Sequence, residues 1–182
     1  MTVLERPVIA IAGVCSGLNK SDVQIDLLSR LKKDGLDIKA ISNNPVGLLY
    51  DMEVFNYPTE LKFPDVVYSI NKYMYLTEVN ENMDAWLINI GGAIGQVNNL
   101  NTYNFGKLAD AYLSATNIDV AIMCVNAFVD VLNLKLQLAI YTNMELKIYL
   151  LFCLITILMQ PQWIIRMVYR LTMWTMKNIS RH

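Results

Sequence analysis

The chain has little histidine, little cysteine and little charge, and each shortage excludes a class of site. Its one histidine is His182, so Ser-His-Asp triads and zinc sites built on internal histidines are excluded. Its three cysteines, Cys15, Cys124 and Cys153, form no CxxC pair and no disulfide framework, which favours a reducing compartment. Only 17% of the residues are charged and the formal net charge is −1, so a generally basic nucleic-acid binder is not expected.

Hydrophobic residues, in contrast, are plentiful, and the charges are unevenly placed. The 182 residues are 54% hydrophobic, which excludes a disordered protein and suits about one domain with a sizeable core. Residues 1–145 hold all 16 acidic residues, whereas residues 146–182 hold five basic residues and no acidic one. We therefore expect an α/β domain over residues 1–128, followed by an atypical apolar and basic tail over residues 129–182.

Strand and helix patterns alternate along the first two thirds of the chain. Short apolar runs predict strands at 7–12, 37–42, 83–90 and 118–125, and helical spacing predicts helices at 21–33, 65–80 and 103–114. This order predicts a Rossmann-like or P-loop-like parallel sheet with flanking helices, with a long connection over 43–64. Ligands of such sheets bind beyond the carboxyl ends of the strands, where Gly13–Ser21, Gly91–Gly95 and Asn126 fall.

The tail carries three further patterns. Residues 132–138 alternate as a strand does, and the apolar run 148–159 is shorter than the ~20 residues of a spanning helix, which favours a core helix or an interfacial segment. Beyond residue 163, four basic residues fall on one side of a helical wheel: Arg166, Arg170, Lys177 and Arg181. This pattern suits both a helix on an anionic membrane surface and a core-docked helix with a solvated basic stripe. A shifted reading frame or an unrelated tail would also explain the composition.

The segment GVCSGLNKS, Gly13–Ser21, joins the first predicted strand to the first predicted helix. A phosphate-binding loop belongs at this place, because backbone N–H groups at a helix N-terminus and a lysine ammonium bind phosphate, and glycines let the backbone come close. A following hydroxyl can reach Mg²⁺, so Ser21 and Asp22 are the candidate metal ligands. The residues expected to bind ATP or GTP with Mg²⁺ are Gly13, Ser16, Gly17, Asn19, Lys20, Ser21, Gly91 and Gly92.

The match to the pattern GxxxxGK[ST] is incomplete. Lys20 and Ser21 fit its end, but Asn19 stands where its last glycine belongs. Asparagine tolerates a left-handed backbone better than most residues, so the loop can still form. Cys15 lies inside the loop, where a helix N-terminus is expected to lower its pKa. An ordinary glycine-bearing turn with an exposed lysine remains the alternative.

Hydrolysis has less support than binding, because no acid ends the predicted strands beside the loop. A Walker B strand ends in an acid that helps to hold Mg²⁺. The strand at 83–90 instead ends with Asn89 and Ile90, and the strand at 118–125 is followed by Asn126. Whether the chain is an enzyme therefore stays open. A kinase or ligase would need its acid from Asp22 or from a partner, and a non-catalytic scaffold is the third hypothesis.

The N-terminal segment also resembles a known family. Lys20, Asp22, Gln24 and Gly35, followed by the strand DIKAIS, resemble the start of the peptide maturation system proteins of clostridial-type bacteria, with Ser21 in place of that family's aromatic residue. Two later segments add to the resemblance, which covers about residues 7–128: Ile70–Tyr73 and Leu87–Gly95 (LINIGGAIG). The lysine turn and the strand ending in Gly-Gly are more distantly similar to dethiobiotin-synthetase-like P-loop proteins.

This resemblance implies an accessory protein that assists the maturation of a ribosomally made peptide. Its implied partners are a precursor peptide and a radical-SAM maturase, and its implied ligand is a nucleotide or another phosphate. Residues 129–182 do not resemble the family's ending. With no secretory signal in the first residues, we expect a cytoplasmic protein, with membrane association through the tail as the added alternative.

Overall fold

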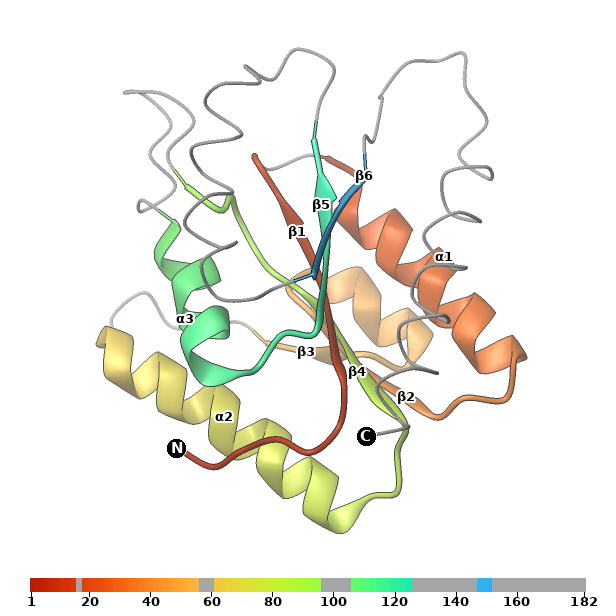
Figure 1. The fold of residues 1–182 in the computed structure, drawn as a ribbon. Coiled ribbons are helices and arrows are strands. Elements are labelled where there is room, and N and C mark those ends of the chain that lie inside the picture. The colour runs from red at the N-terminus through yellow and green to blue at the C-terminus, as the bar shows by residue number, and fades with distance from the viewer. Residues whose placement is uncertain (16–17, 56–60, 96–105, 126–146, 152–182) are drawn as a thin grey trace.

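The computed structural model describes residues 1–15, 18–55, 61–95, 106–125 and 147–151, which form an α/β fold around one parallel sheet (Figure 1). The strand order is β3-β2-β4-β1-β5-β6, and every neighbouring pair is parallel. The strands are β1 Val8–Gly13, β2 Ile38–Ser42, β3 Glu53–Val54, β4 Ala85–Asn89, β5 Val120–Cys124 and β6 Lys147–Leu151. The helices are α1 Lys20–Lys33, α2 Phe63–Asn80 and α3 Lys107–Ala115, with a 3₁₀ helix, η1, at Pro45–Tyr50. The predicted fold class is therefore confirmed.

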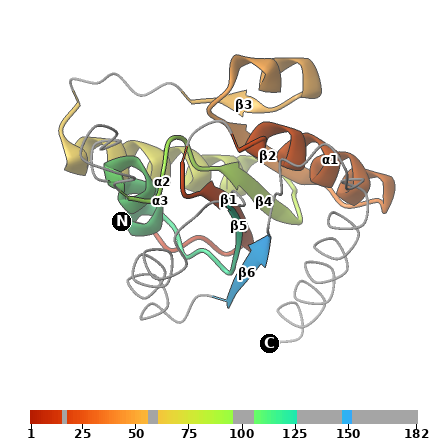
Figure 2. The same cartoon turned by 90° about the horizontal axis from the view of Figure 1, so that it is seen from above.

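The helices cover both faces of the sheet. Figures 1 and 2 show α1 on one side of the strands and α2 with α3 on the other. The central strand β1 is buried along its whole length, which is expected of a parallel strand covered on both faces. The helix α1 lays Val23, Leu27 and Leu31 against the sheet at helical spacing. This arrangement brings the carboxyl end of β1 and the start of α1 to one edge of the sheet.

Two sequence expectations need correction. The connection 43–64 contains η1 and β3, although no periodic pattern marks either of them. The apolar run that favoured a helix or an interfacial segment begins instead in β6, which pairs with β5 from Val120↔Lys147 to Cys124↔Leu151. A short apolar run carries no period that separates a buried strand from a buried helix. The predicted strand at 132–138, Asn126 and the basic helix after 163 lie outside the described residues. Among the described helices, none is long and apolar enough to cross a membrane.

One buried amide ties α2 to both neighbouring segments. Asn71 is 2% exposed, and its Nδ2 donates to the Thr2 carbonyl at 2.9 Å and to the Ala115 carbonyl at 2.8 Å. Its Oδ1 accepts from the Thr2 N–H at 2.9 Å. The amide thus joins the N-terminal segment, α2 and the end of α3, and it gives the buried Ala115 carbonyl its partner.

Replacing Asn71→Leu should lower the free energy of unfolding by about 2 kcal/mol, because the buried Ala115 carbonyl loses its partner. Urea denaturation followed by circular dichroism measures this loss. Asn80→Leu on the same helix is the matched control, because Asn80 is exposed and its change should stay within about 0.5 kcal/mol. Equal losses in the two variants would contradict the assignment.

Candidate functional site

The turn between β1 and α1 is closely packed at its first residue. The Val14 N–H donates to the Cys124 carbonyl at 3.2 Å, which holds the chain against β5 as it leaves β1. A Cβ added to Gly13 would lie 3.1 Å from Cδ of Lys20 and 3.3 Å from the Cys124 carbonyl oxygen. A side chain at Gly13 would therefore crowd the lysine, which passes close to the Gly13 backbone.

Asn19 is the N-cap of α1 and has a left-handed backbone, with φ 51° and ψ 28°. Its carbonyl accepts from the Val23 N–H at 3.1 Å and so begins the helix. Asparagine thus takes the backbone conformation that the phosphate-loop pattern assigns to glycine, as the sequence predicted. Its side chain makes no capping hydrogen bond in the described structure, so it satisfies none of the first-turn N–H groups of α1.

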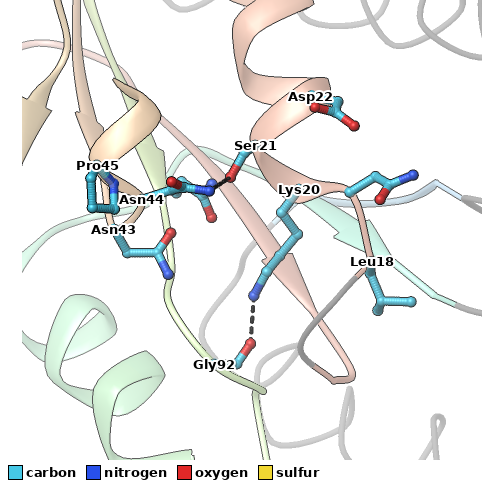
Figure 3. A pocket seen from close by; sticks show the side chains of 10 residues that line it. Leu18, Lys20, Ser21, Asp22, Asn43, Asn44, Pro45 and Gly92 are labelled. Carbon is cyan, nitrogen blue, oxygen red and sulfur yellow. Dashed lines mark hydrogen bonds between the residues drawn. The ribbon is translucent and has the colours of Figure 1, made fainter. Parts of the chain in front are cut away.

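Lys20 places a buried ammonium group at the start of α1. The residue is only 7% exposed, and its Nζ donates to the Ile90 carbonyl at 2.9 Å and to the Gly92 carbonyl (Figure 3). Burial lowers its pKa, because the charged form loses water. An ammonium has three N–H donors, and the two carbonyls use two of them. Among the described residues, the third N–H has no acceptor and can donate to a ligand.

The turn after β4 closes the opposite side of this site. The Ile94 N–H donates to the Gly13 carbonyl at 3.0 Å, which holds the turn against the end of β1. Gly92 has a φ of +71°, a conformation that glycine adopts without strain. A Cβ on Gly91 would lie 2.8 Å from Nδ2 of Asn43 and 3.0 Å from Cδ2 of Leu108. Both predicted glycines are thus needed for the shape of the turn whose carbonyls hold Lys20.

The segment after β2 forms the third wall. Asn44 donates from Nδ2 to Oγ of Ser21 at 3.4 Å, and its Oδ1 accepts from the Val46 N–H at 3.0 Å as the N-cap of η1. Figure 3 shows Asn43, Asn44 and Pro45 facing the start of α1. One asparagine therefore both begins η1 and holds η1 beside the hydroxyl of Ser21.

These three walls surround a cavity of about 390 Å³ at the carboxyl edge of the sheet. The cavity is lined by residues from all three segments and from the last position of β4: Leu18, Asn19, Lys20, Ser21, Asp22, Asn43, Asn44, Pro45, Asn89 and Gly92. The described lining contains four asparagines, one lysine and one carboxylate. It is therefore rich in neutral hydrogen-bonding groups and nearly balanced in charge.

The structure brings most of the predicted site residues together. Asn19, Lys20, Ser21 and Gly92 line the cavity, and the predicted metal ligand Asp22 lies at its exposed margin. Gly13 and Gly91 pack behind the lysine and the turn, and the predicted residues Ser16 and Gly17 lie outside the described residues. Sequence reasoning missed Asn43, Asn44 and Asn89 as part of the site. Their position directly at the ends of two predicted strands was the available signal.

The expectation for Cys15 was wrong. Its thiol is partly buried, and burial raises its pKa, an effect that the nearby Lys20 ammonium only partly opposes. Desolvation disfavours the thiolate more than the positive charge favours it. A raised pKa favours the thiol over the thiolate, which makes Cys15 a weaker nucleophile.

The left-handed conformation of Asn19 predicts an order of stability. Asn19→Gly should keep or raise the free energy of unfolding, whereas Asn19→Ala should lower it by about 1 kcal/mol, because a Cβ without a local hydrogen-bonding side chain is strained there. Thermal denaturation measures the order, with the exposed Lys32→Ala on the same helix as control. An alanine variant as stable as the glycine variant would show that the turn has another conformation.

Comparison with protein-family models gives no match, and comparison with curated protein sequences gives none. Among solved structures, the chain is similar to chloroplast FtsY from Physcomitrella patens, with 16% identity and a TM-score of 0.45 over 82% of this chain. The match spans 50% of the FtsY chain, so this chain covers about half of that protein. It is also similar to a mutant of the Mycobacterium tuberculosis APS kinase CysC, with 12% identity and a TM-score of 0.41 over 94% of this chain and 97% of that one. The chemistry of the site has to be argued from its own residues.

Proposed function

We propose that this chain binds the phosphate groups of a nucleotide, such as ATP or GTP, in the cavity at the start of α1. The observation that carries the proposal is the position of Lys20. Its buried ammonium lies between a helix N-terminus and a cavity at the carboxyl edge of a parallel sheet. A cation and the N-terminus of a helix at the same cavity attract an anion, which they can hold by charge-assisted hydrogen bonds.

The size and lining of the cavity support a small polar ligand. Its volume of about 390 Å³ lies within the usual range of small-molecule sites, ~300–1,000 Å³. Ser21 and Asn19 can each add hydrogen bonds to phosphate oxygens from the first turn of α1. The exposed mouth leaves the remainder of a nucleotide outside the phosphate site.

Ser21 and Asp22 are the proposed Mg²⁺ ligands of the cavity. The Ser21 oxygen accepts one hydrogen bond from Asn44 and has a second lone pair, and the Asp22 carboxylate is exposed. Among the residues the structure describes, no three histidine, cysteine or acidic side chains come together. A Mg²⁺ ion in the complex would therefore arrive on the nucleotide, and we derive no hydrolytic or phosphoryl-transfer step.

For the biological role we propose an accessory protein of a peptide maturation system. The support is the sequence resemblance over about residues 7–128, in which Lys20, Asp22 and Gln24 follow the family's pattern. Gln24 also has a structural part: its Nε2 donates to the Ile41 carbonyl at 2.8 Å and to the Leu87 carbonyl at 3.2 Å. The proposed partners are a ribosomally made precursor peptide and a radical-SAM maturase.

Calorimetric titration of the whole chain with Mg-ATP and with Mg-GTP tests the phosphate site. Lys20→Met should weaken binding at least about tenfold, because a charge-assisted hydrogen bond contributes roughly 1.5–3 kcal/mol. Lys33→Met is the matched control, since it removes the same charge from the exposed far end of the same helix. An equal loss of nucleotide affinity in both variants would mean that only the net charge of the protein matters, which contradicts a specific role for Lys20. A folded wild-type chain that binds neither nucleotide would refute the proposal.

The peptide maturation role makes a separate prediction about the DNA that flanks the coding region. We expect genes for a radical-SAM maturase and for a small cysteine-rich peptide beside it, and we expect that peptide to be retained by the immobilised chain. Neighbouring genes of unrelated function, together with no retention of the peptide, would contradict the role while leaving the phosphate site untouched.

A further inference from the structure

Asn89 is a buried amide without a partner in the described structure. It is the last residue of β4, its exposed fraction is 0%, and neither its Nδ2 nor its Oδ1 has a hydrogen-bond partner. Leaving a buried polar group unpaired costs about 1–3 kcal/mol, so such groups are rare in native proteins and require an explanation. The same residue lines the cavity described above.

The direction of the Asn89 side chain follows from the register of β4. Nε1 of Trp86 donates to Glu78 of α2 at 2.9 Å, so Trp86 faces the side of the sheet that α2 covers. Side chains alternate along a strand, so Asn89 faces the other side, which α1 covers. There it lies next to Ile90, whose carbonyl accepts from Nζ of Lys20. The unpaired amide of Asn89 thus lies at the same end of β4 as the carbonyl that accepts from the Lys20 ammonium.

The chemistry of an amide at this place differs from that of a carboxylate. A carboxylate at the end of the strand beside a phosphate loop holds Mg²⁺ and repels a bare phosphate. An amide carries no charge, and its two N–H donors can bind a phosphate oxygen directly. The lining as described offers Lys20 as its cation and only the exposed Asp22 as its anion. The donor set therefore suits an anion and not a protein-held metal ion.

We infer that Asn89 is a ligand-contacting residue whose amide donates to a bound phosphate, so that the site holds a nucleotide without needing Mg²⁺. This inference rests on the proposed function and specifies the form of its ligand. Because Lys20 spans from α1 to the carbonyls beside Asn89, a phosphate that engages its ammonium meets the strand end where the amide lies. The ligand then supplies the partner that Asn89 lacks in the free protein.

A second buried amide provides the competing explanation. Gln24 is 1% exposed, its Oε1 has no partner in the described structure, and it lies on α1 against the same face of the sheet. If Asn89 were in fact paired with Gln24 in solution, it would be a structural residue with no part in binding. The two explanations predict opposite effects on the stability of the ligand-free protein.

Asn89→Leu separates these explanations, because leucine has a similar shape and no hydrogen-bonding group. We expect the ligand-free variant to melt at a higher temperature than the wild type, and we expect at least about tenfold weaker binding of ATP measured in EDTA. A variant that melts at a lower temperature, or that binds ATP with unchanged affinity, overturns the inference. Ser29→Ala, an exposed change on α1, is the control and should alter neither quantity.

Metal dependence gives the second readout. For the wild type, ATP in EDTA should bind within about threefold of Mg-ATP, since no protein carboxylate holds the metal. Asn89→Asp should weaken binding in EDTA at least about tenfold and restore part of it when Mg²⁺ is added. Wild-type binding that falls more than about tenfold in EDTA overturns the inference.

The two proposals can fail separately. Absence of ATP binding by the wild type in both EDTA and Mg²⁺ refutes the phosphate site and the inference with it. Binding that depends on Lys20 but requires Mg²⁺, or that ignores Asn89, refutes the inference alone. Binding that depends on both residues and persists in EDTA supports both.

Discussion

The buried ammonium of Lys20 is the constraint on which this edge of the molecule depends. A buried charge is costly unless hydrogen bonds replace its water, and here the carbonyls of Ile90 and Gly92 do so. The turn after β4 must therefore point two carbonyls inward, which Gly92 allows with its positive φ. The lysine passes so close to Gly13 that a Cβ there would lie 3.1 Å from its Cδ. A single cation thus accounts for the shape of two loops that are distant in the sequence.

The parts of the fold that were predictable are those with a local signal. Apolar runs located β1 and β4, and the turn chemistry of Asn19 anticipated its left-handed backbone. The rest depends on tertiary contacts. Nothing local shows that Asn44 caps η1 and reaches Ser21, or that burial outweighs the nearby Lys20 ammonium in setting the pKa of Cys15. For the same reason, the apolar run that begins at residue 148 did not indicate that its first residues form part of β6.

The described lining of the cavity is rich in groups that can donate hydrogen bonds to an anion. Its described lining offers one buried cation, several amides and a hydroxyl, and the end of β4 carries an amide in place of an acid. Such a site suits a protein that responds to the presence of a nucleotide, for example by changing how it holds a partner. The accessory role suggested by the sequence resemblance is compatible with this chemistry.

The most direct measurement is a titration of the ¹⁵N-labelled chain with inorganic pyrophosphate, followed by amide chemical shifts in nuclear magnetic resonance spectra. Pyrophosphate isolates the phosphate contacts from those of the base and the sugar. The account predicts that the largest shifts fall on the amides of Asn19–Val23 and on those of 89–92, with the side-chain amide of Asn89 among them. If the amide chemical shifts of these residues do not change, or if the largest changes cluster elsewhere on the protein, the phosphate site centred on Lys20 is contradicted.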